Sequence, residues 1–108
     1  MKIPRLTMLT LGVGNLDKAV IFYEAVLDTH PNTSYSGMVF IGLPGTWISL
    51  YPLEKLASDI AQNVQTCRDG FGGLTLAYNA DSKDEVIAVI ERARLAGAKL
   101  TKEAQETF

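Results

Sequence analysis

The chain has 108 residues, a length that fits one domain with a single modest core rather than two independent domains. Hydrophobic residues make up 47% of it, charged residues 20%, and the net charge is −2, which is the composition of a folded globular protein and not of a disordered one. The basic residues are scattered among acidic ones. No nucleic-acid partner is therefore predicted, because a duplex-binding surface needs clustered positive charge.

The longest apolar runs are the length of strands and fall short of the ~20 residues that cross a bilayer, so no membrane partner is predicted. The segment Met1–Leu6 lacks the apolar centre of a signal peptide, and we expect a cytoplasmic location. The single cysteine, Cys67, cannot form an internal disulfide, which agrees with a reducing compartment. It lies in a polar stretch without a nearby histidine, so a loop residue is favoured over a catalytic thiol.

The first predicted unit is a strand followed by an amphipathic helix. Apolar and β-branched residues predict the strand over Leu6–Val13, and the helix begins at Leu16 with Asn15 as its N-cap. Alternation along the strand separates a face that packs on the helix from a face that lines a cavity. Met8 and Thr10 lie on the cavity face.

A hairpin is predicted next. The apolar runs Tyr35–Leu43 and Thr46–Pro52 are separated by Pro44-Gly45, which is a strong turn signal. In the second run, alternation assigns Ile48 and Leu50 to the core. It assigns three residues to the opposite face: Trp47, Ser49 and Tyr51.

The second half of the chain repeats the strand–helix pattern. A short helix is predicted over Pro52–Gln62, and after a glycine-rich joint a strand is predicted over Leu74–Tyr78. A second helix follows over Ser82–Ala96, with Ser82 as N-cap in a capping box, and a further strand is expected over Ala98–Thr101.

No catalytic residue can be assigned from the sequence. The only histidine, His30, lies in a loop beside a proline and is interpreted as a solvated side chain without a partner. The acids with any claim to an acid–base role fall on predicted helices or loops among polar neighbours, where a surface carboxylate is the default. These acids are Glu24, Asp28, Glu54, Asp59 and Glu85.

The order of the predicted elements, with GVGNLDKAVIFYEAVLD in the first unit and LTLAYNADSKDEVIAVIERARLAGAKL in the second, resembles the vicinal oxygen chelate superfamily. This group includes glyoxalases, bleomycin-resistance proteins and extradiol dioxygenases. The resemblance implies an α+β fold of paired βαβββ modules whose curved mixed sheet encloses a cavity. Residues 1–108 then form one domain, with module one at about 1–62 and a partial, incomplete module two at about 72–108.

The resemblance also implies where metal ligands would lie. Metal-dependent members carry a His or Gln on the first strand of a module and a Glu on the last, and these positions correspond here to Met8, Ser49 and Gly73 or Leu74. None of these residue types is a usual ligand for a divalent metal, so no metal and no cofactor are predicted. Family members continue into a further hairpin and strand, and we therefore expect truncation of a longer protein and a homodimer.

The predicted ligand-binding wall consists of aromatic, thioether and hydroxyl side chains. It comprises Met8, Thr10, Trp47, Ser49 and Tyr51, with Thr75 and Tyr78 as further candidates. The favoured function is a metal-independent protein that binds or sequesters a small, mostly apolar or aromatic molecule. Three alternatives stay open. These side chains could fill a closed core, the chain could be a metal-dependent glyoxalase- or dioxygenase-like lyase or oxidoreductase with ligands from the missing C-terminus or a partner chain, or dimerisation could itself be the function.

Overall fold

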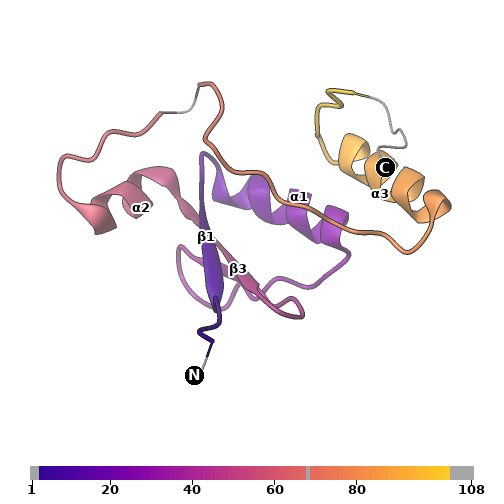
Figure 1. The fold of residues 1–108 in the computed structure, drawn as a ribbon. Helices are drawn as coiled ribbons and strands as arrows, with labels where there is room; N and C mark the ends of the chain where they lie inside the picture. The colour runs from indigo at the N-terminus through magenta and orange to yellow at the C-terminus, as the bar shows by residue number, and fades with distance from the viewer. Residues whose placement is uncertain (1–2, 68, 103–108) are drawn as a thin grey trace.

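The computed structural model describes residues 3–67 and 69–102. The elements follow in the order β1 (Met8–Val13), α1 (Leu16–Leu27), β2 (Val39–Ile41), β3 (Trp47–Pro52), α2 (Leu53–Ile60) and α3 (Lys83–Leu95). Figure 1 shows α1 beside the strands, with α2 and α3 on opposite sides of this unit. The predicted α+β class with a mixed sheet is confirmed.

Within residues 3–67 and 69–102, the sheet has three strands in the order β1-β3-β2 and is not closed. β1 runs parallel to β3, which a helix crossover makes possible, and β2 pairs antiparallel with β3 as the predicted hairpin. An isolated antiparallel bridge between Asn32 and Phe40 adds a fourth strand position beside β2. This order of one strand, one helix and three strand positions is consistent with a partial glyoxalase-fold module.

The core lies between one face of this sheet and α1. Its buried side chains come from β2 and β3, and Leu11, Val13 and several residues of α1 pack against them. The buried cluster consists of Val39, Ile41, Ile48 and Leu50. The prediction that Ile48 and Leu50 face the core is therefore confirmed.

Helix α1 begins as its sequence predicts, with Asn15 as its N-cap. The Asn15 side chain accepts a hydrogen bond from the backbone N–H of Lys18 (3.0 Å), which satisfies one of the donors that a helix start leaves free. At the other end, Asp28 adopts a left-handed conformation and its N–H bonds to the carbonyl of Glu24.

Two predicted strands of the second half are wrong. Neither Leu74–Tyr78 nor Ala98–Thr101 forms a strand, because neither backbone finds a neighbouring strand to pair with among the described residues. The large apolar side chains of the first segment stay exposed, including Leu74, Leu76 and Tyr78. The predicted division into two modules is not tested by this arrangement and stays a prediction.

Helix α3 forms without that strand. The Ser82 hydroxyl accepts from the N–H of Glu85 (3.1 Å), and the Glu85 carboxylate accepts from the N–H of Asp81 (2.8 Å). The helix packs on α1, where the Arg92 guanidinium donates to the carbonyls of Ala25 and Val26. Within the described residues, no helix is long and apolar enough to cross a membrane.

Candidate functional site

The sheet face opposite α1 carries the predicted binding residues as cross-strand pairs. In the parallel register of β1 and β3, Met8 lies opposite Trp47, Thr10 opposite Ser49, and Gly12 opposite Tyr51. Successive residues of a strand point to opposite faces, so these alternate pairs share one face. All five predicted residues are thus brought together along two adjacent strands.

The middle pair is joined by a side-chain hydrogen bond. The Thr10 and Ser49 hydroxyls lie 2.6 Å apart, and either oxygen can donate. Ser49 is 0% exposed although serines are mostly found at the surface. Its hydroxyl is satisfied by Thr10, which removes the cost of burying an unpaired polar group.

The end of this face at Gly12 is closed by α2. A Cβ placed on Gly12 would lie 2.7 Å from Leu53 Cδ1 and 3.2 Å from Leu56 Cδ2, so only glycine leaves room for these leucines. α2 begins directly after β3, and this short connection places its first residues over the sheet. A ligand on this face therefore cannot extend past the Gly12–Tyr51 pair.

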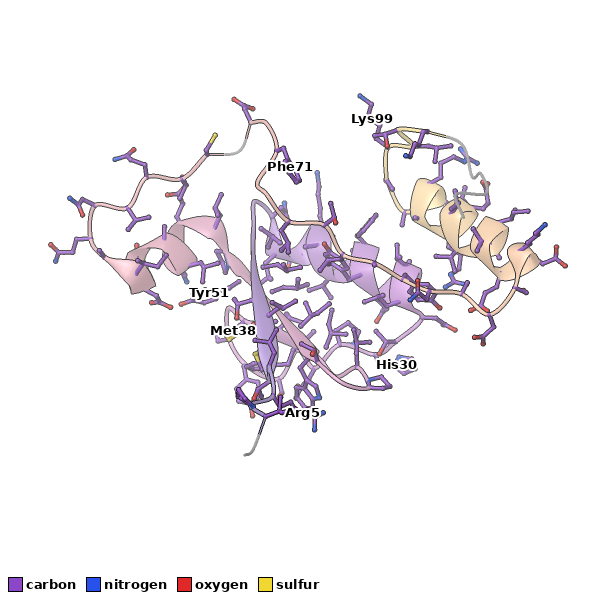
Figure 2. The ribbon with its side chains drawn as sticks, viewed as in Figure 1. Arg5, His30, Met38, Tyr51, Phe71 and Lys99 are labelled. Atoms are coloured by element: carbon purple, nitrogen blue, oxygen red, sulfur yellow. The ribbon has the colours of Figure 1, made fainter. Side chains whose placement is uncertain are left out.

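The opposite end of the face is open at Met8 and Trp47. A hollow of about 430 Å³ lies there, within the usual size range of small-molecule sites. Its lining residues come from β1, from β3 and from the segments that precede these strands: Arg5, Thr7, Met8, Gly45 and Trp47. Figure 2 shows Arg5 close to the N-terminal end of the described chain, below the sheet.

The Trp47 indole is supported on one side by the backbone. A Cβ placed on Gly42 would lie 3.2 Å from both Cε2 and Cζ2 of the ring, so the indole lies against this glycine. Trp47 nevertheless keeps 48% of its surface exposed. Thr10 is also exposed, whereas Ser49 is buried and Met8 and Tyr51 are half-buried, so the predicted residues are only partly enclosed in the part of the chain described.

A second hollow of about 420 Å³ lies on the other side of the sheet, between α1 and the loop before β2. It is lined by Leu16, Asp17, Val20, Ile21, Thr33, Tyr35, Gly37 and Val39. It contains none of the predicted binding residues. This hollow serves below as a comparison for the first.

The positions that correspond to family metal ligands do not fit a divalent metal. Met8 offers a thioether and Ser49 a buried hydroxyl already bonded to Thr10, whereas such metals take imidazole, carboxylate or thiolate. Gly73 and Leu74 lie in the exposed segment before α3 and carry no ligand atoms in their side chains. The described residues contain no cluster of three or more His, Cys, Asp or Glu that could hold a metal ion.

The remaining candidates lie away from this face. His30 is exposed, and Figure 2 shows it on the other side of the ribbon from Tyr51. The Cys67 thiol is exposed in a loop and bonds to the carbonyl of Asp69. Glu24, Asp28, Glu54 and Asp59 are exposed, as expected, whereas Glu85 is half-buried because its carboxylate caps α3.

Sequence reasoning missed Arg5 and Gly45, which complete the hollow. The Arg5 guanidinium donates to the Gly45 carbonyl (2.8 Å), and two further bonds join the same segments, from Thr46 Oγ1 to the Leu6 carbonyl (3.3 Å) and from the Trp47 N–H to the Thr7 carbonyl (3.1 Å). These contacts join residues about 40 positions apart along the chain. The only local signal for Arg5 was its place just before an apolar strand, and basic residues are too common there to indicate a site.

Comparisons with known proteins agree with this fold. Three similar solved structures are a glyoxalase-related enzyme from Fulvimarina pelagi (24% identity, TM-score 0.77), a hypothetical protein from S. aureus (20%, 0.77) and a glyoxalase/bleomycin resistance protein/dioxygenase family enzyme from Burkholderia phytofirmans PsJN (21%, 0.78). The alignments cover 88%, 99% and 97% of this chain and 66%, 80% and 83% of those chains, respectively. At these identities the likeness shows the fold alone. No curated protein sequence matches the chain.

The family is shown by the sequence itself. The model of the Glyoxalase/Bleomycin resistance protein/Dioxygenase superfamily matches residues 5–108, which is nearly the whole chain and includes both strand–helix units. The strand, helix and hairpin order of the structure agrees with this match. The chain therefore belongs to the glyoxalase/bleomycin resistance protein/dioxygenase superfamily.

Proposed function

We propose that this chain binds a small, mostly apolar or aromatic molecule at the open end of the sheet face, without a metal. The observation that carries the proposal is the Trp47 indole, which rests against Gly42 and is 48% exposed beside the Met8 hollow. An aromatic ring held on one side and open on the other is a ready surface for stacking. The Met8 thioether adds a polarizable contact that adapts to ligand shape.

The closed end and the hydroxyl pair define the rest of the site. Leu53 and Leu56 limit the length of a ligand at Gly12, and the exposed Thr10 hydroxyl, held by Ser49, offers one polar contact in the middle. No described residue on this face is an acid or base placed to transfer a proton. Binding or sequestration is accordingly the favoured role rather than turnover.

Trp47 is the only tryptophan, so its fluorescence reports on this hollow directly. Titration with the neutral apolar dye Nile red is expected to quench Trp47 and to enhance the dye emission. Trp47→Leu should weaken dye binding about tenfold, the effect of losing an aromatic contact and part of the buried area. Tyr35→Leu, which removes an exposed aromatic at the other hollow, is the matched control and should leave binding unchanged.

Two results would contradict the proposal. Absence of any change in Trp47 fluorescence over a dye and drug panel would overturn the binding role. Stoichiometric Zn, Ni, Fe or Mn retained by the purified protein would overturn the metal-independent part and favour the enzyme alternative. Metal content by mass spectrometry provides this second measurement.

Homodimerisation belongs to the same proposal. Among the described residues, the outer edge of β1 has no strand partner, and the segment with Leu74, Leu76 and Tyr78 leaves apolar side chains exposed. Unpaired strand edges and exposed apolar side chains both favour association. Light scattering is expected to give twice the mass of one chain, and a monomer at high concentration would contradict this part.

A further inference from the structure

We propose that the ligand of the Met8–Trp47 hollow is an aromatic carboxylate, with its ring on Trp47 and its carboxylate on Arg5. This inference rests on the proposed binding function and adds the chemical class of the ligand. It depends on Arg5, which lines the same hollow as the Trp47 indole.

The position of Arg5 is fixed by the backbone. Its guanidinium donates to the Gly45 carbonyl, and the two segments are joined just after these residues by the bonds from Thr46 to Leu6 and from Trp47 to Thr7. A guanidinium has five N–H donors, so a single carbonyl leaves most of them available. The flat arrangement of these donors matches the two oxygens of a carboxylate.

The charge of Arg5 has no acidic partner among the described residues. Its one hydrogen bond there is to a neutral carbonyl, in contrast to Arg94, which forms an ion pair with Glu91. The side chains that share the hollow with Arg5 are all uncharged, namely Thr7, Met8 and Trp47. The hollow is therefore locally positive although the chain carries a net charge of −2.

The apolar part of the hollow selects a ring. The indole of Trp47 presents its open side opposite the Gly42 contact, and Met8 is its cross-strand neighbour. A planar aromatic group gains more from this pair than an aliphatic one, because it can stack on the indole and contact the thioether. The volume of about 430 Å³ accommodates a substituted single ring or a fused pair.

A matched pair of ligands tests the carboxylate directly. 4-tert-Butylbenzoate and its neutral amide, 4-tert-butylbenzamide, have the same ring and nearly the same shape, and both are titrated against the intact chain by Trp47 fluorescence and calorimetry. The benzoate is expected to bind about tenfold more tightly, the effect of one charge-assisted contact at a partly exposed site. Arg5→Gln should reduce the benzoate affinity to that of the amide and leave the amide affinity unchanged.

Lys18→Gln is the control, because it removes the same charge from an exposed residue of α1 and should leave the tenfold ratio intact. Equal affinities for benzoate and amide in the unchanged protein would overturn the carboxylate inference but retain the proposed binding function. A benzoate preference that survives Arg5→Gln would overturn the role of Arg5. Failure of both ligands and of Nile red to change Trp47 fluorescence would overturn the proposed function itself.

Discussion

The two strand–helix units of the chain have similar sequences and different structures. In the first, the strand β1 pairs with β3 along its whole length and α1 packs on the buried face. In the second, Leu74–Tyr78 pairs with nothing among the described residues, while α3 forms with a complete N-terminal cap. The same pattern thus gives a helix in both units and a strand in only one.

The difference follows from where each element obtains its hydrogen bonds. A helix satisfies its backbone within its own segment, and Asn15 and Ser82 supply the missing acceptors at the two helix starts. A strand needs a neighbour, and the only strands described belong to the first unit. Among the described residues, the candidate face forms only in the first unit, because two paired strands are needed to place its side chains together.

The largest expected difference between the two units is in the loss of stability when one leucine of each is replaced by alanine. Leu50 is 0% exposed in the core, and Leu50→Ala should lower the free energy of unfolding by about 3 kcal/mol through lost burial and a cavity. Leu76 is 45% exposed, and Leu76→Ala should cost less than about 1 kcal/mol. Urea unfolding followed by Trp47 fluorescence measures both changes.

The same two variants can also show that the second unit is buried like the first. An equal and large loss for Leu76→Ala would mean that the segment Leu74–Tyr78 is buried in solution, against a partner strand or a second copy of the chain. Repeating the measurement at several protein concentrations separates these two cases, since only association makes the loss depend on concentration.

An intermediate effect is expected at the contact between the two units. Arg92 of α3 donates to the carbonyls of Ala25 and Val26, and α1 has no basic residue of its own in its last turn. A cation there complements the negative end of the helix dipole as well as the free carbonyls. Arg92→Met should therefore cost about 1 to 2 kcal/mol and detach α3 from α1.

Hydrogen exchange of the α3 amides measures this detachment. Arg94→Met serves as the control, because Arg94 lies on the same helix and contacts only the exposed Glu91 in the described chain. Faster exchange in α3 for Arg92→Met but not for Arg94→Met is the expected result. Equal exchange in both variants would show that the apolar contacts between the helices suffice to hold α3.

The sequence was sufficient for the parts of the fold that depend on local signals. Cap residues and the Pro44-Gly45 turn placed both long helices and the hairpin, and alternation assigned Ile48 and Leu50 to the core. Alternation failed at Leu74–Tyr78 because it reports which faces a strand would have and not whether a partner exists.

The candidate site was predicted only in its strand residues. Met8 and Trp47 follow from alternation on two separate strands, but the register that makes them neighbours is a long-range property. Arg5 lies beside them because its guanidinium bonds to the Gly45 carbonyl, 40 residues further along the chain. The contact of Trp47 with Gly42 depends on how the strands on either side of the turn pair. Neither contact has a sequence pattern that distinguishes it from chance.

The smallest expected effects are on the pH dependence of stability, which differs between the two units. In the first, burial raises the pKa of Tyr23 above its ordinary value of 10.0, so the folded state favours the neutral phenol. Its contribution to stability is complete below about pH 10 and is lost as the pH rises through the raised pKa. Tyr23→Phe should remove this alkaline loss in urea unfolding, and Tyr35→Phe, at an exposed tyrosine, should not.

In the second unit, the hydrogen bond from Arg94 lowers the pKa of Glu91 below its ordinary value of 4.5. The folded state therefore favours the carboxylate, and its contribution is present above about pH 4.5 and is lost as the pH falls through the lowered pKa. Because both side chains of this pair are exposed to solvent, Glu91→Gln should cause little change in the free energy of unfolding at acid pH. A large acid effect of Glu91→Gln would instead place α3 in a buried interface, which is the arrangement that a dimer through the second unit requires.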